Sequence, residues 1–258
     1  MGHDAIVSYA LDGPVAVITL DKPPLNLIDL ELIDGLVAAL VRARNDDRAA
    51  AVVVTTALDR AFSAGLDLNR VLDGGSAMMR ALLRKLYVEL YDAQHELGKP
   101  SIAAIRGLAR GGGMTIALSS NVVVAAEDAS FGYPELDVGI LPGLHFTHLP
   151  RIVGRHKAFE LLFAGSTFDA AEAVRLGLVN RAVPAGELLA GAMNMALAFA
   201  RKPPGAIAIA REHFMRINDR DYRSEIAGVI DDMARMIDGE ETQAALRRFL
   251  RRGKAAPE

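Results

Sequence analysis

The chain has 258 residues, of which 51% are hydrophobic, so it is long and apolar enough to bury a sizeable core. Its 29 basic and 32 acidic side chains are mixed along the sequence and leave a net charge of -3, which excludes a broad positive field for nucleic acid or an acidic membrane. It contains no cysteine, which excludes disulfides, thiolate nucleophiles and zinc–thiolate sites.

The N-terminal segment, residues 1–10, lacks the basic region followed by an apolar stretch that a secretory signal has. No run of about 18 apolar residues, the length of a membrane-spanning helix, occurs in the sequence. We therefore expect a cytoplasmic protein whose partners include neither a membrane nor a nucleic acid.

Strand patterns open the chain. Residues 6–9 and 15–20 flank Asp12-Gly13-Pro14, which predicts a hairpin with a short turn. From Asp29, a candidate N-cap, apolar residues recur at helical spacing as far as Val41. Residues 51–54 form a short, continuous apolar run, which is typical of a parallel strand buried on both faces.

Two strand–loop–helix units follow. After the glycine-containing segment 61–68, a long helical pattern runs to Gly98-Lys99-Pro100. The apolar run 102–105 then leads into a triple glycine and a short helix, and residues 122–125 read as the next strand. This repetition predicts right-handed crossovers and a largely parallel sheet.

Helical patterns replace the strand signals after residue 150. They cover residues 155–163, 170–176 with Gly177 as C-cap, 187–201, 204–217, 224–237 and 240–250. The last three are more apolar than a thin layer over a sheet requires, so they either add to the core or form a subunit contact. The polar tail 251–258 is expected to fray.

Gly111-Gly112-Gly113 lies between a predicted strand and a predicted helix. Consecutive glycines cost conformational entropy, so these positions need positive φ angles or the close approach of another molecule. Their N–H groups at a helix N-terminus favour an anion or a developing oxyanion. A close helix–strand crossing that needs glycine only for space is the alternative.

Several common kinds of functional site are excluded, because the sequence lacks their motifs. The sequence has no phosphate-binding G-x-x-x-x-G-K-[ST] loop, no complete dinucleotide fingerprint, no G-x-S-x-G elbow and no H-E-x-x-H pattern. His145 and His148 lie three residues apart and are interpreted as polar packing residues. We predict neither a metal nor a cofactor.

Glu135 follows Pro134 in an otherwise apolar segment. Burial would raise the pKa of this carboxyl toward the range useful for a general acid or base, whereas a surface loop would leave it ordinary. Two sets of convergent backbone N–H groups beside one carboxylate suit proton abstraction next to a carbonyl whose oxygen becomes an oxyanion.

Successive motifs of the chain are similar to those of one known family. They are AFSAGLDL at residues 61–68, Lys99-Pro100 with AAIRG at 103–107, the triple glycine, FGYPE at 131–135 and GILPG at 139–143. AAEA at 170–173 and GLVN at 177–180 continue the series. The ordered set resembles the crotonase (enoyl-CoA hydratase/isomerase) superfamily over nearly the whole chain.

The resemblance implies an α/β fold in which residues 1–195 form a spiral of ββα units that carries the acyl-CoA site. Residues 196–258 would form a helical region used in trimer assembly, usually built into hexamers. The implied substrate is an acyl-CoA thioester, so that coenzyme A is part of the substrate and not a cofactor.

The resemblance also implies roles for individual residues. The backbone N–H groups of Leu66 and Gly112 would form the oxyanion hole, and Glu135 would be the catalytic carboxylate. Ala64 and Leu68 match positions that border the adenine end of CoA, with ordinary turn packing as the alternative. The remaining residues expected to border substrate are Gly111, Thr115, Gly143 and His145.

Three positions depart from the family pattern. Thr115 stands where the family's hydratases carry a second glutamate. Without an activating partner, the pKa of a threonine hydroxyl is far too high for the group to serve as a general base. Arg110 replaces an apolar residue and could face solvent, pair with an acid or approach a substrate group, and the first is the expectation. Residues 144–146 replace small residues and are expected to narrow a loop that lines the acyl pocket.

Three functions stay open at this point. An isomerase that moves a double bond from the 3 to the 2 position needs one base, which fits the single glutamate best. A hydratase must also orient and activate water, which two carboxylates do better. The third possibility is an acyl-CoA-binding protein without catalytic activity.

Overall fold

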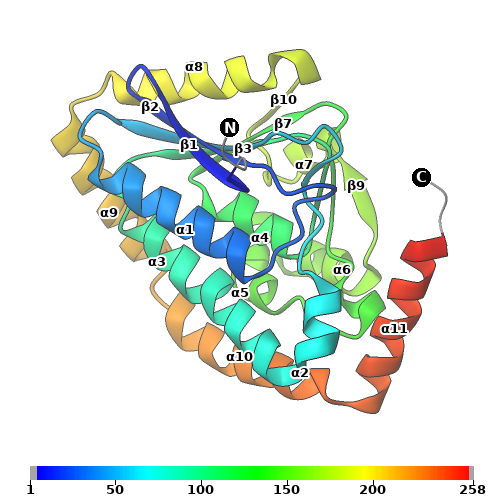
Figure 1. Cartoon of the computed structure of the whole chain (residues 1–258). Helices are drawn as coiled ribbons and strands as arrows, with labels where there is room; N and C mark the ends of the chain where they lie inside the picture. Colours follow the sequence, from blue (N-terminus) through cyan, green and yellow to red (C-terminus); the bar gives the residue numbers. More distant parts are fainter. Residues whose placement is uncertain (1–4, 256–258) are drawn as a thin grey trace.

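The computed structural model describes residues 5–255, which form two β-sheets enclosed by helices (Figure 1). The larger sheet has the order β1-β2-β3-β5-β7-β10. Its strands are β1 (Val7–Asp12), β2 (Val15–Leu20), β3 (Ala51–Thr56), β5 (Ser101–Ile105), β7 (Val122–Ala126) and β10 (Arg181–Val183). Only the β1–β2 hairpin is antiparallel among these described strands, so the predicted hairpin and parallel sheet are confirmed.

The smaller sheet has the order β4-β6-β8-β9. Its strands are β4 (Ala61–Ser63), β6 (Leu108–Arg110), β8 (Ser130–Gly132) and β9 (Thr167–Asp169). β4, β6 and β8 each come directly after a strand of the larger sheet and pair in parallel with one another. The chain therefore alternates between the sheets in strand–strand–helix units, and the predicted α/β spiral is confirmed.

Helices cover both faces of the larger sheet, as Figure 1 shows. On one face, α8 (Leu188–Ala200) packs across β2, β3, β5 and β7. On the other, α1 (Leu30–Asn45) packs against β1 and β2, and α4 (Gly112–Ser119) against β5 and β7. The central strands are buried on both faces, which explains why residues 51–54 and 102–105 are continuously apolar.

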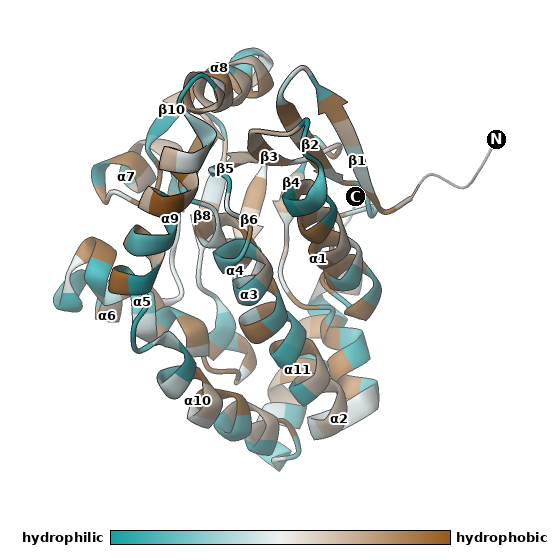
Figure 2. Cartoon of the chain, turned by 90° about the vertical axis from the view of Figure 1, so that its left-hand side faces the viewer, coloured by the Kyte–Doolittle hydropathy of each residue, from teal (hydrophilic) through white to brown (hydrophobic). Residues whose placement is uncertain are grey.

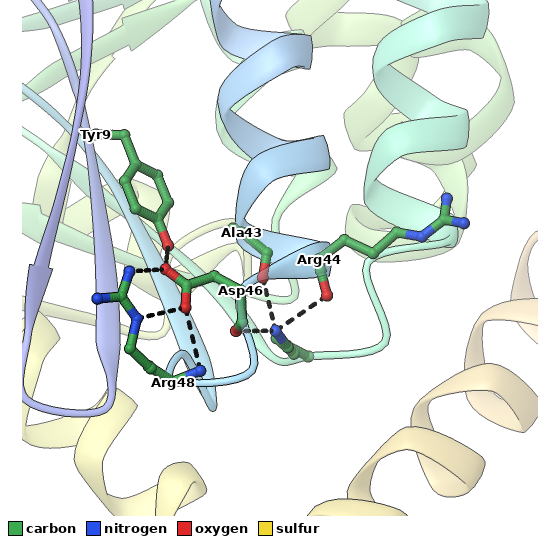
Figure 3. A network of polar contacts seen from close by, with 6 residues as sticks. Tyr9, Ala43, Arg44, Asp46 and Arg48 are labelled. Atoms are coloured by element: carbon green, nitrogen blue, oxygen red, sulfur yellow. Dashed lines mark hydrogen bonds and ion pairs between the residues drawn. The ribbon is translucent and has the colours of Figure 1, made fainter.

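Polar side chains close both ends of α1. The carboxylate of Asp29 accepts a hydrogen bond from Leu32 N at 3.0 Å, as expected of an N-cap. At the other end, Lys99 Nζ donates to the carbonyl oxygens of Ala43, Arg44 and Asp46, and a cation is favourable at a helix C-terminus. The Asp46 side chain binds Arg48 and the hydroxyl of Tyr9 (Figure 3). The Lys99-Pro100 motif thus joins the loops that precede β3 and β5.

A helical arm with one interruption connects β4 to β5. It consists of α2 (Leu68–Leu83), the π-helical segment η1 (Arg84–Glu89) and α3 (Leu90–His95). Gly75 interrupts α2 with a φ of +58°, and Asp67 caps its first turn by accepting from Asn69 N and Arg70 N. The predicted long helix before Gly98 is confirmed.

The C-terminal helices pack on this arm. They are α9 (Pro204–Asn218), α10 (Tyr222–Ile237) and α11 (Glu240–Ala255). In Figure 2, α9 and α10 alternate between teal and brown, as helices with one buried face do. α10 lies against α2, and α11 lies against both α2 and the short 3₁₀ helix η2 (Glu135–Val138). The predicted boundary at residue 195 falls within α8 and stays a prediction.

The predicted ends of the later helices agree with the structure to within a few residues. They include α6 (Arg155–Ala164) and α7 (Ala170–Arg175), which is followed by Gly177 at a φ of +77°. The last helix continues to Ala255, beyond the predicted fraying point, and residues 256–258 of the tail lie outside the described residues.

The segment after Gly143, predicted as a loop, is the helix α5 (Gly143–Val153). Pro150 lies inside this helix, where its fixed φ is compatible with helical geometry although its missing N–H removes a hydrogen bond. Gly154, at a φ of +82°, separates α5 from α6. Within residues 5–255, no helix combines the length and the apolar character needed to cross a lipid bilayer.

Candidate active site

Two glycine turns meet where β4 and β6 end. A Cβ atom added to Gly65, which has a φ of +94°, would lie 2.9 Å from Arg110 O and 3.5 Å from Gly112 N. A Cβ on Gly113 would lie 2.3 Å from Ser63 O. The backbones of the two turns therefore approach so closely that only glycine fits at these positions.

The N–H groups of Leu66 and Gly112 are free to bind an acceptor from outside these turns. Ile28 N donates to Gly65 O at 2.8 Å, and Asp67 N donates to Ile28 O at 2.9 Å. This bridge therefore uses the carbonyl before Leu66 and the N–H after it, but not the N–H of Leu66 itself. Gly112 is the first residue of α4, where an N–H has no partner within the helix. Neither N–H donates to another group in the described part of the chain. Their convergence on one substrate oxygen stays a prediction.

A cavity of about 320 Å³ opens beside these turns. Its wall includes Ala64, Leu66, Leu68, Gly111, Gly112 and Glu135, which the sequence had placed at the site. The rest is mostly apolar and comes from distant parts of the chain, including Leu25, Leu27, Leu86, Tyr87, Val138, Ile140, Met233, Phe249 and Leu250. Sequence reasoning missed these residues, because nothing in their local pattern distinguishes them from ordinary core positions.

Glu135 begins η2 at the cavity wall. Its side chain is only 14% exposed, and its Oε2 atom is buried without a hydrogen-bond partner among the described residues. Burial disfavours the charged form and raises the pKa of Glu135 to about 8. Of the described residues that line this cavity, Glu135 is the only one with a carboxyl group. A pKa in this range is compatible with proton transfer near neutral pH, and the catalytic role of Glu135 stays a prediction.

Thr115 and His145 lie behind Glu135 and do not line this cavity. His145 is fully buried, and its Nε2 atom is 3.5 Å from Thr115 Oγ1 and 3.7 Å from Glu135 Oε1. Thr115 faces a second cavity of about 190 Å³, which His148 also lines. The hydroxyl of Thr115, where the resemblance implies a second carboxylate in hydratases, thus lies next to a histidine.

Gly143 lies apart from both cavities, at the start of α5. A Cβ atom on this residue would lie 2.2 Å from Val229 Cγ1 and 2.8 Å from Met233 Sδ. Glycine is needed here because α10 packs closely against α5. The structure therefore offers a packing reason for Gly143, while a contact with substrate stays a prediction.

Arg110 does not point freely into solvent, contrary to the prediction. Its side chain is half-buried, and Nη2 donates to Ser130 Oγ at 2.6 Å. Because the partner lies at the start of β8, this contact ties β6 to the neighbouring strand. Burial lowers the pKa of the guanidinium group.

No metal site is evident in the described residues. Residues 5–255 contain no group of three or more His, Asp or Glu side chains arranged to hold an ion. His145 and His148 contact each other, and the carboxyl of Glu135 lies near His145.

The family comparison agrees with this geometry. The model of the family described as "Enoyl-CoA hydratase/isomerase" matches residues 11–257. The chain belongs to the enoyl-CoA hydratase/isomerase family. The resemblance inferred from the motifs is confirmed, and the protein is an enzyme of the crotonase superfamily.

Individual relatives cover almost the whole chain. A "Probable enoyl-CoA hydratase" of Bacillus subtilis (strain 168) is 32% identical over 96% of both proteins. The solved structure of Pseudomonas aeruginosa DspI is 30% identical and has a TM-score of 0.80, covering 98% of this chain and 96% of that one. An enoyl-CoA hydratase/isomerase from Xanthobacter autotrophicus Py2 is 28% identical with a TM-score of 0.86, covering 98% and 99%.

Proposed function

We propose that the protein moves the double bond of a 3-enoyl-CoA to the 2 position. Glu135 carries this proposal as the one carboxylate among the described residues of the cavity wall, because the reaction needs one group that removes an α proton and returns it at the γ carbon. When the proton leaves, the C–H electron pair forms a double bond between C1 and C2 and the carbonyl π pair moves onto oxygen, which gives a dienolate. When the carbonyl re-forms, the C1–C2 π pair becomes the new double bond between C2 and C3, and the π pair between C3 and C4 takes the proton from Glu135 at the γ carbon, so the reaction balances without a cofactor.

The oxyanion of this enolate is assigned to the N–H groups of Leu66 and Gly112. Both residues line the same cavity as Glu135, and both N–H groups lack other acceptors among the described residues. Donors held in place before the reaction stabilise developing negative charge at little reorganisation cost. Leu66 and Gly112 would therefore act through the backbone, while Glu135 acts through its side chain.

The apolar cavity supports an acyl-CoA substrate with an uncharged acyl group. Its described lining contains no lysine or arginine that could neutralise a second carboxylate on the acyl chain. Ala64 and Leu68 lie at the wall and are assigned to the CoA portion of the substrate. The names of the relatives also refer to enoyl-CoA compounds.

Hydration of a 2-enoyl-CoA is the second candidate, because relatives such as the Bacillus subtilis protein are named hydratases. Hydration requires a positioned water as well as a base. The hydroxyl of Thr115 is directed to His145 and lies outside the cavity lining, so it is poorly placed to hold that water. Comparing isomerisation with hydration on substrates of equal chain length tests the choice, and binding without turnover would identify a non-catalytic member.

We also propose that the chain assembles into trimers or hexamers in the cytoplasm. Large apolar side chains on α9 are exposed in the isolated chain: Ile209 is 61% exposed, and Phe214 and Ile217 are each 63% exposed. Exposed apolar side chains on one helix suit burial against another subunit. Light scattering, which measures the mass of the particle in solution, tests this assembly.

A further inference from the structure

A chain of polar contacts leads from Glu135 into the interior through two histidines of α5. His145 Nε2 lies 3.7 Å from Glu135 Oε1, and His145 Nδ1 lies 3.3 Å from His148 Nε2. The spacing of three residues along the helix places both imidazoles on one face. His145 is completely buried, and both of its ring nitrogens lie next to polar groups of the protein.

The surroundings of His145 determine which of its nitrogens carries hydrogen. Gly111 O lies 3.3 Å from Nε2, and a backbone carbonyl can only accept. This contact favours a neutral ring with its hydrogen on Nε2, in which case Nδ1 accepts from His148 Nε2–H. Burial lowers the pKa of His145 well below its ordinary value and lowers the pKa of His148 to about 4, so both rings are neutral at pH 7.

We propose that His145 is a positioning residue for Glu135: held in the Nε2–H tautomer by His148, it shares this hydrogen between Gly111 O and the Glu135 carboxylate and favours the ionised, basic form of that carboxylate. The proposal rests on the proposed role of Glu135 as acid/base, and it applies to isomerisation and hydration alike. The 3.7 Å separation is too long for a hydrogen bond in the unliganded protein. Such contacts commonly shorten when substrate binds.

The other polar groups near His145 and His148 do not favour a charge on either imidazole. Tyr133, whose ring is 4.5 Å from that of His145, and Thr115 offer only hydroxyl groups, which are uncharged at neutral pH. Arg151 on α5 opposes protonation of His148. The second cavity, which His148 lines, also contains Tyr91, Asp219 and Tyr222, and Asp219 is the only carboxylate among its described lining residues.

A neutral donor has a different effect from that of a cation. An arginine or a protonated histidine close to Glu135 would lower the pKa of its carboxyl by roughly 1–3 units. A neutral N–H stabilises the carboxylate less and leaves it protonatable, which a proton shuttle requires. Loss of this donor should therefore raise the pKa at which the enzyme becomes active.

The pH dependence of kcat/KM in three variants tests the proposal. His145→Phe should move the ascending limb upward by about one pH unit, which lowers kcat/KM about tenfold at pH 7 but restores it toward wild type above the new pKa. His148→Phe should shift the limb in the same direction by a smaller amount, because the tautomer of His145 is no longer held. His145→Gln, which keeps a donor, should return the limb toward its wild-type position.

His156→Phe is the matched control, because His156 is exposed on α6. The His156→Phe enzyme should keep the wild-type pH profile. In His145→Phe, KM should change less than about twofold, because His145 does not line the substrate cavity. A His145→Phe enzyme that loses activity equally at every pH, with an unmoved limb, would overturn the proposal in favour of a purely structural histidine.

A second measurement uses the wild-type protein and does not depend on any variant folding. Nitrogen-15 NMR of labelled histidine should show His145 as the Nε2–H tautomer with no titration between pH 5 and 8. The Nδ1–H tautomer, or a titration in that range, would contradict the proposal. An active Glu135→Gln enzyme would instead contradict the proposed role of Glu135. The two outcomes are distinguishable, because the NMR spectrum of the wild type reports only the state of His145.

Discussion

Gly65 and Gly112 lie with their backbones in contact, and a Cβ atom on Gly65 would be 3.5 Å from the amide nitrogen of Gly112. The two residues are 47 positions apart in the sequence, and the pairing of β4 with β6 brings them together. This contact places the neighbouring N–H groups of Leu66 and Gly112 at one cavity wall. The proposed oxyanion hole therefore depends on backbone geometry and not on side chains.

Substitutions at Leu66 separate the backbone from the side chain. Leu66→Ala keeps the N–H and should leave turnover within about tenfold of wild type, whereas Leu66→Pro deletes the donor and should reduce kcat by roughly 10²–10³. Circular dichroism and thermal unfolding would show whether both variants fold. A folded proline variant with full activity is incompatible with the assignment of residue 66.

Glu135 should give the enzyme an ascending pH profile. Because the base must be ionised and burial raises the pKa of Glu135 to about 8, kcat/KM should increase with pH and level off above about pH 8. Glu135→Gln should abolish turnover at every pH. Asp137→Asn, on the same short helix but exposed, is the matched control and should retain wild-type activity. Measurable turnover by a pure Glu135→Gln preparation would remove Glu135 from the mechanism.

The same pKa shift has a consequence for stability. The folded-state pKa of Glu135, about 8, is above the unfolded value of about 4.3, so its protonated form stabilises the fold below the unfolded pKa and this contribution is lost as pH rises toward 8. Glu135→Gln cannot ionise and should unfold at a temperature higher than wild type at pH 8–9, by about 3 °C or more. Scanning calorimetry at pH 5 and pH 9 measures this difference, which should shrink or vanish at pH 5.

Isomerisation should be faster than hydration by at least about tenfold. The absence of one positioned acid/base group typically lowers a rate by about 10²–10⁴, and it affects hydration more than a proton transfer that needs one base. A side-by-side assay of 3-enoyl-CoA and 2-enoyl-CoA, matched in chain length over several lengths, measures the ratio. Thr115→Glu should raise hydration if the buried site next to His145 accepts the longer side chain. Thr115→Ser is its control. Faster hydration across the whole series would reject the isomerase proposal.

Light scattering of the full chain should give the mass of a trimer or hexamer at micromolar concentration. Truncation before Ser224 removes most of α10 and all of α11, which cover α2 and contribute to the cavity. The truncated chain should therefore be insoluble or heterogeneous. A monomer mass for the full chain, or a soluble and monodisperse truncated monomer, would argue against the proposed assembly.

Local pattern in the sequence determined most of the regular structure. Residues 51–54 and 102–105 are continuously apolar because parallel strands are buried on both faces, and Asp29 precedes a helical pattern because its carboxylate accepts from a free N–H. The triple glycine and the residues around Glu135 indicated the candidate site and its family, because the chemistry of both depends on short, contiguous motifs.

Tertiary structure decided the features that join distant segments. The short strands β9 and β10 have only three residues each and exist through pairing with β8 and β7, so no local period could identify them. The helix α5 was hidden by Gly143, which is required for close packing against α10, and by Pro150. Phe249 reaches the cavity only because α11 folds back over η2. The placement of His145 behind Glu135 likewise depends on how α5 packs, because sequence spacing reports neither burial nor the distance between side chains on different elements.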